Sequence, residues 1–177
     1  MASSVRRHKW ISRNLLRVCF GICLFILQAS AASAANSCAW INEATASSLL
    51  GGDAVGNVTS TDGGKTTVCT FTQTGSDAVR TLRVTVEIAA DPHTRMGALA
   101  QSCGAGSAPL KAIGNEALTC PADDRNGAPG EKLVGRVRDQ VFTITISSTL
   151  KKDSTLTRED LHSKIYLAAE QVAGNLF

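Results

Sequence analysis

The sequence predicts an α+β fold: an antiparallel sheet built from hairpins, with helices packed on one face and two disulfide bonds. Segments of alternating apolar and polar residues are typical of strands with one buried face, and short turn signals separate them. A helical repeat of apolar residues ends the chain, and an even number of cysteines lies in the region that follows a predicted export signal.

The first 35 residues have the features of a secretory signal peptide. Five basic residues precede an apolar run from Val18 to Leu27, and small residues follow in "QASAASAA". The apolar run is about ten residues long, whereas a membrane-spanning helix needs roughly 20. We therefore expect residues 1–35 to be a cleaved signal peptide and residues 36–177 to be a single domain, with no stable membrane anchor after cleavage.

Charge argues against a nucleic-acid partner. The chain has 18 Lys and Arg residues against 15 Asp and Glu residues, but five of the basic ones lie in the predicted signal peptide. The mature chain would keep 13 basic and 15 acidic residues, a formal net charge of −2. The basic balance belongs to the targeting segment, and we expect no nucleic-acid binding.

The mature chain is expected to begin with a helix and a hairpin. The helix covers residues 42–52 and ends at the pair Gly51 and Gly52, because glycine adopts the left-handed conformation of a C-terminal cap. Strands over residues 54–61 and 66–74 flank "DGGK", a sequence typical of a hairpin turn.

A third strand and a second helix are expected next. Residues 81–89 alternate strictly, which predicts one buried side formed by Leu82, Val84, Val86 and Ile88. Asp91 and Pro92 then begin a helix, since proline is tolerated in a first helical turn. This helix is expected to end near Gly104.

The second half is expected to add two strand pairs and a long helix. Residues 110–120 predict a strand, a turn at Gly114–Asn115 and a further strand, and residues 132–148 predict a hairpin with Phe142, Ile144 and Ile146 on one face. Thr157 and Asp160 fit a helix-capping pattern. The helix after them has apolar residues at helical spacing: Leu161, Ile165, Ala168, Ala169, Val172 and Leu176.

The cysteines of the mature chain are predicted to form disulfides: Cys38, Cys69, Cys103 and Cys120. Three pairings are possible. A Cys38–Cys69 bond would clamp the first helix onto the sheet, and a Cys103–Cys120 bond would close a loop of about 18 residues, worth roughly 3 kcal/mol. Since net stability is typically about 5–15 kcal/mol, loss of either bond is expected to threaten the fold. Cys120 is thus predicted to be a structural clamp and not a nucleophile.

No catalytic, cofactor or metal site is predicted. The spacing C-x-x-C is absent, and the mature chain keeps only His93 and His162. Neither belongs to a recognised triad motif, so we expect surface or capping roles for both. The polar loop over residues 121–131 is the expected binding segment, through Asp123, Asp124, Arg125 and Asn126. Its acidic pair does not complete a calcium-binding pattern.

Three segments carry a family resemblance: "CAWINEATASSLLGG", "VCTFTQ" and "AIGNEALT". With the amphipathic final helix, they resemble small exported bacterial domains of unknown function, some of them lipoproteins and some the sensor-like outer domains of receptor kinases. The resemblance implies a two-disulfide α+β domain with a groove, and it transfers no catalytic residue. This chain differs from the lipoprotein members because the residues before Cys38 lack a lipobox.

The expected function is that of a secreted or periplasmic, non-enzymatic module that binds an extracytoplasmic ligand or protein. Two alternatives stay open: a hydrolase-like enzyme whose site these motifs do not describe, and a protease-inhibitor-like protein that presents its polar loop. A deep pocket with converging polar groups would indicate an enzyme. A rigid extended loop would indicate an inhibitor, and an apolar groove with a polar rim a binding module.

Overall fold

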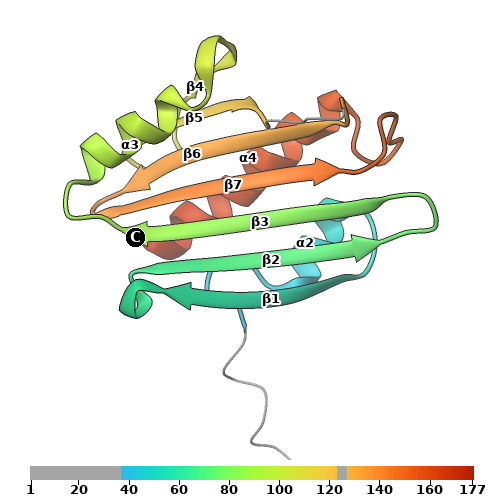
Figure 1. Cartoon of the computed structure of the whole chain (residues 1–177), viewed down its shortest axis with the longest axis horizontal. Coiled ribbons are helices and arrows are strands. Elements are labelled where there is room, and N and C mark those ends of the chain that lie inside the picture. Colours follow the sequence, from blue (N-terminus) through green and yellow to red (C-terminus); the bar gives the residue numbers. More distant parts are fainter. Residues whose placement is uncertain (1–36, 123–126) are drawn as a thin grey trace, which may run out of the picture. The chain divides into compact units, whose positions relative to one another are not determined.

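The computed structural model describes residues 37–122 and 127–177. Within them, seven strands form one antiparallel sheet in the order β1-β2-β3-β7-β6-β5-β4 (Figure 1). The strands are β1 Ala54–Thr61, β2 Thr66–Thr74, β3 Val79–Ile88, β4 Ala108–Leu110, β5 Glu116–Pro121, β6 Gly130–Val137 and β7 Gln140–Ser148. The helices are α2 Glu43–Leu50, α3 Pro92–Gln101 and α4 Arg158–Leu176, with short 3₁₀ turns η2 Asp62–Gly64 and η3 Gly104–Gly106. The α+β prediction is confirmed, whereas the predicted signal peptide lies outside the described residues.

The sheet consists of two meanders, β1 to β3 and β4 to β7, joined by the pairing of β3 with β7. In this pairing Leu82 lies opposite Ile146, and Val84 lies opposite Ile144. The apolar sides predicted for the two strands therefore meet on one face. One hydrophobic core thus serves both meanders.

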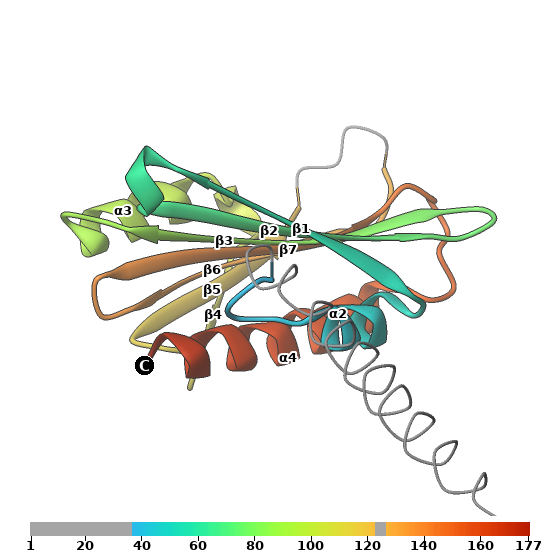
Figure 2. The ribbon, with the colours of Figure 1, turned by 90° about the horizontal axis from the view of Figure 1, so that it is seen from below.

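That core lies between the sheet and two helices, α2 and α4, which lie along the same side of the sheet (Figure 2). All six apolar residues predicted for the last helix are buried, as are Leu82, Val84 and Val86. Gly135 of β6 lies opposite Phe142, and a Cβ at this glycine would collide with the Phe142 ring. Ile88 is an exception to the predicted pattern, because it pairs with Gln140 where β3 ends and β7 begins, and it is 50% exposed.

Helix α3 departs from the expected arrangement, because it lies against the opposite face of the sheet. Its buried residue Met96 does not belong to the main core. Val134 of β6 and Val141 of β7 are also buried outside that core, and they alternate along their strands with residues that point into it. The sequence could not assign this face, because a helix of ten residues with one buried side chain carries almost no periodic signal.

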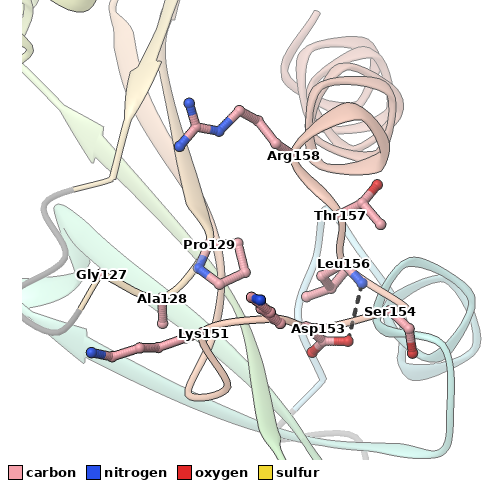
Figure 3. A pocket seen from close by; sticks show the side chains of 10 residues that line it. Gly127, Ala128, Pro129, Lys151, Asp153, Ser154, Leu156, Thr157 and Arg158 are labelled. Atoms are coloured by element: carbon pink, nitrogen blue, oxygen red, sulfur yellow. Dashed lines mark hydrogen bonds between the residues drawn. The ribbon is translucent and has the colours of Figure 1, made fainter.

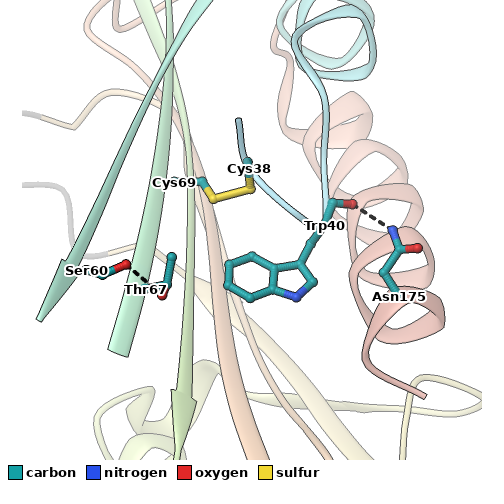
Figure 4. Close-up of a disulfide and its surroundings, with 6 residues drawn as sticks. All are labelled: Cys38, Trp40, Ser60, Thr67, Cys69 and Asn175. Atoms are coloured by element: carbon teal, nitrogen blue, oxygen red, sulfur yellow. Dashed lines mark hydrogen bonds between the residues drawn. A yellow bond between two sulfur atoms is a disulfide. The ribbon is translucent and has the colours of Figure 1, made fainter. Parts of the chain in front are cut away.

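The four cysteines form disulfides, as predicted, and of the three possible pairings the structure has Cys38–Cys69 and Cys103–Cys120. The first ties the segment before α2 to β2 on the core face, beside Trp40 (Figure 4). The second ties Cys103, two residues after the end of α3, to β5. Each face of the sheet therefore has its own covalent clamp.

Candidate functional site

Two adjoining hollows lie at the N-terminal end of α4, and we call them together the α4 cleft. The first has a volume of about 450 Å³ and lies between the loop after β7 and the residues before β6 (Figure 3). The second has a volume of about 280 Å³ and lies among the ends of β5 and β6 and the first turns of α4. Both are lined by Pro129 and Arg158. The cleft is therefore built where several elements end, a usual place for binding residues.

One wall of the cleft, the loop between β7 and α4, is fixed by the buried carboxylate of Asp153. Arg80 of β3 donates two hydrogen bonds to it, from Nε at 2.7 Å and from Nη2 at 2.9 Å. The Ser148 hydroxyl donates at 2.6 Å, and the backbone amides of Thr155 and Leu156 donate at 2.8 and 3.2 Å. Since the Asp153 side chain has no exposed surface, this network holds the loop rigidly against the sheet.

The same donors control the charge of this carboxylate. The Arg80 guanidinium is the main cause that lowers the pKa of Asp153 far below its ordinary value, and the Ser148 hydroxyl and the two loop amides add to it against the effect of burial. Asp153 is therefore ionised in the folded protein at every pH at which an unfolded aspartate is ionised.

Stability is expected to fall in acid because of this group. Its folded pKa is depressed, so its contribution is fully present above the unfolded value of about 3.9 and is lost as the pH falls toward the folded value. We expect the urea midpoint to decline steadily between about pH 5 and about pH 3. Urea unfolding across this range measures it, with Asp153→Asn as the control that should decline less. A wild-type decline equal to that of the variant would contradict the assignment.

The second hollow contains a histidine paired with a carboxylate. Nδ1 of His162 lies 3.0 Å from Oε1 of Glu131, and the Glu131 side chain is only 14% exposed. Arg158 lies one helical turn before His162 and so shares its face of α4. His162 thus lies at the cleft and is oriented by Glu131. From the sequence we expected a surface or capping role for it and did not predict this location.

Of the residues that the structure describes, three with cationic side chains line the first hollow: Lys151, Lys152 and Arg158. None of them forms an ion pair with a carboxylate of the described residues. Asp153, which also lines the first hollow, is already paired with Arg80. Within the described part of the cleft, positive charge is therefore available for a ligand.

Two side chains of the second hollow that could carry chemistry, Cys120 and His162, are already engaged with other residues. Cys120 lines the second hollow, but its sulfur is bonded to Cys103 and offers no thiolate. Among the described residues, His162 has Glu131 as its hydrogen-bond partner and forms no hydrogen bond to a hydroxyl, although Thr119 lines the same hollow. The part of the chain that the structure describes also holds no group of three or more His, Cys, Asp or Glu placed to bind a metal ion.

The predicted binding loop contributes its flanks to the cleft. Pro121, Pro129, Gly130 and Glu131 line it, whereas the predicted residues Asp123, Asp124, Arg125 and Asn126 lie outside the described residues.

The other candidates of the sequence have structural roles away from the cleft. His93 lies in the first turn of α3, and its Nδ1 is 3.2 Å from Oε1 of Glu116 in β5. The Asn115 side chain accepts a hydrogen bond from the Arg138 amide at 2.7 Å. The Arg136 guanidinium, which donates to Glu116 at 2.6 Å, lowers the pKa of that carboxyl, and His93 adds to the effect. The segment around Gly114 is thus a turn, with its polar residues engaged in holding neighbouring elements.

Sequence reasoning missed the residues that build the cleft. Arg80 and Asp153 are 73 positions apart, and nothing in either local pattern links them. The adjacent Lys151 and Lys152 are visible in the sequence, but two lysines in a polar segment are ordinarily just solvated. The sequence prediction nearest to the cleft is the loop at residues 121–131, whose described flanks line it. A role of this loop in binding stays a prediction.

Comparisons of the chain with protein-family models, with curated proteins and with solved structures found no match. No helix among the described residues is long and apolar enough to cross a membrane. The two disulfides indicate an oxidising, extracytoplasmic environment.

Proposed function

We propose that this protein is an exported, non-enzymatic binding module whose α4 cleft takes a negatively charged ligand. The observation that carries the proposal is the set of three cationic side chains around the first hollow, Lys151, Lys152 and Arg158. Asp153, the carboxylate among the described residues that line this hollow, is already paired with Arg80. Charged groups at a cleft with low-dielectric walls attract ligands of opposite sign and speed their association.

Three further features support the location and the class. The disulfides require an oxidising compartment to form and persist, and residues 1–35 have the composition of a signal peptide. The resemblance to small exported bacterial domains agrees with both. The buried Arg80–Asp153 pair preorganises one wall, so little ordering free energy is lost when a ligand binds.

A hydrolase is the second candidate, and His162 with Glu131 is the observation that favours it. A histidine held by a carboxylate through Nδ1 presents its other nitrogen as a base. Such an enzyme would have to activate water, since no nucleophilic hydroxyl is paired with His162 among the described residues.

The binding proposal is tested by titrating the oxidised mature chain with acetylated hexaglutamate while following amide chemical shifts by NMR. We expect shifts confined to the residues that line the α4 cleft, and an affinity that falls as salt is added because exposed charges are screened. Hexalysine and a neutral hexaserine peptide are expected to leave the spectrum unchanged. Equal binding of all three peptides, or shifts at another surface, would refute the proposal.

Charge reversal provides the matched variants. Arg158→Glu is expected to weaken hexaglutamate binding by about tenfold or more, a loss of about 1.4 kcal/mol, because it replaces an attractive charge at the centre of the cleft with a repulsive one. Lys65→Glu makes the same change in net charge on an exposed residue beside η2, at the opposite end of the sheet, and should change affinity little. Equal effects of the two variants would mean that net charge and not the cleft governs binding.

A further inference from the structure

Helix α3 is attached to the sheet differently from the rest of the molecule. It lies on the face opposite to the main core, and its one buried residue, Met96, lies outside that core, as do Val134 and Val141 of the two strands that α3 contacts. Burial of a single methionine provides a small hydrophobic contribution to docking compared with a core of 25 buried residues.

The other apolar residues of α3, such as Leu99, are at most half-buried, and the polar contacts of this segment lie close to solvent. Arg95 pairs with Glu87 of β3 at 2.9 Å, and His93 approaches Glu116 of β5 at 3.2 Å. After the helix, Lys132 of β6 donates to the Ser102 hydroxyl at 2.9 Å. Exposed pairs of this kind contribute little to stability, because solvent screens them and because ordering the side chains costs entropy.

The covalent bond between Cys103 and Cys120 is therefore the strongest restraint on α3. It joins the residues that follow α3 to β5 across 17 positions of sequence. Removing it frees the segment from β3 to β5 to gain conformational entropy, while the sheet keeps its core. Local opening of a weakly packed unit is the expected response.

The two sulfurs of this bond differ in access. Cys120 is 3% exposed, whereas Cys103 is only half-buried. A thiolate from outside can therefore approach Cys103 more readily than Cys120, and access decides which sulfur of a disulfide is attacked.

We propose that Cys103–Cys120 is a redox modification site, reduced by a dithiol, and that its reduction releases α3 from the sheet. One thiolate of the dithiol attacks Sγ of Cys103 and forms a mixed disulfide, and Cys120 leaves as a thiolate that takes up a proton. The second thiol of the reductant then attacks the mixed disulfide and frees Cys103. The reductant leaves as a disulfide, having transferred two electrons, and reoxidation of the two cysteines restores the clamp.

Release of α3 changes two surfaces. It uncovers the parts of β6 and β7 that α3 contacts, where Val134 and Val141 are 0% and 1% exposed when α3 is docked. It also frees η3, whose Gly106 forms part of the wall of the second hollow together with Cys120. Redox control of ligand binding follows from this second change, and this consequence alone rests on the proposed function.

The test is hydrogen exchange followed by mass spectrometry on the oxidised mature chain and on the same chain treated with dithiothreitol, with alkylation to identify the free thiols. We expect Cys103 and Cys120 to alkylate before Cys38 and Cys69. Amides of α3 should then exchange faster by on the order of a hundredfold, the factor that corresponds to closing a loop of this length. Amides of β2, β3 and β7 should keep their protection.

Variants keep the proposal open to refutation. Cys103→Ala with Cys120→Ala should reproduce the fast exchange of α3 without a reductant, and Cys38→Ala with Cys69→Ala should leave α3 protected wherever the domain stays folded. Unchanged protection of α3 after reduction would overturn the proposal, and so would loss of protection throughout the sheet. Hexaglutamate affinity measured in the two redox states tests only the consequence for the cleft, so its failure leaves the release of α3 standing.

Discussion

Replacing Asp153 with asparagine is expected to lower the free energy of unfolding by about 3–5 kcal/mol, the usual cost of removing one partner from a buried ion pair. The substitution removes the negative charge that Arg80 faces and puts an amide in its place. Arg80 is only 13% exposed, so its guanidinium then lies largely desolvated without a counter-ion. Urea unfolding near pH 7, followed by circular dichroism, measures the loss.

Two comparisons separate this effect from a general cost of mutation. Asp77→Asn makes the same chemical change on an exposed residue of the turn between β2 and β3, and it should stay within about 0.5 kcal/mol of wild type. Arg80→Met combined with Asp153→Leu removes both charges and should cost less than Asp153→Asn alone, because no buried charge is left unpaired. A loss below about 1 kcal/mol for Asp153→Asn would show that the pair does not hold the loop.

The consequence reaches the cleft, because Asp153 also accepts hydrogen bonds from the amides of Thr155 and Leu156, immediately before the N-cap Thr157 of α4. Lys164 of α4 donates to the Thr155 carbonyl at 3.0 Å, and burial lowers the pKa of this lysine. Loss of the ion pair would therefore loosen both the wall of the cleft and the first turn of the helix. A variant at Asp153 is expected to bind hexaglutamate more weakly even though its own carboxylate is not available to the ligand.

The sequence predicted those elements whose burial is periodic. Alternation along β3 placed Leu82, Val84 and Val86 on the buried side, and the spacing of Leu161 and Ile165 placed α4 on the core. Capping chemistry is equally local. Asp91 accepts from the Thr94 amide at 3.1 Å, as the Asp-Pro start of a helix predicts.

Local sequence patterns could not predict the features that depend on which strands are neighbours in the sheet. The pairing of β3 with β7 decides that Arg80 lies opposite Ser148 and close to Asp153, yet Asp153 looks like a solvated residue in "LKKDST". The position of α3 could not be predicted either, because which face of a sheet takes a short helix is a property of the whole sheet. The cleft arises from these long-range relations, which local sequence patterns do not contain.

Removing Cys38–Cys69 is expected to destabilise the whole domain by about 4 kcal/mol, from loop-entropy arithmetic for residues 31 positions apart. Cys69 is fully buried in the core, and Cys38 leads into Trp40 and the buried Ile41 (Figure 4). The Trp40 carbonyl accepts from Asn175 of α4 at 3.0 Å. Without the bond, this segment loses the restraint that holds it between β2 and α4. Alanine at both positions, studied by urea unfolding, avoids placing a new polar group in the core.

The comparison with the other disulfide makes the result diagnostic. Loop entropy alone predicts nearly equal losses for the two bonds, about 4 and about 3 kcal/mol. Packing predicts unequal losses, because a chain without Cys103–Cys120 recovers part of that entropy in the folded state by releasing α3, whereas the segment around Trp40 has no such freedom outside the core. The double alanine variant at Cys38 and Cys69 should therefore unfold at clearly lower urea than the one at Cys103 and Cys120. Equal midpoints would mean that α3 and the core unfold as one cooperative unit.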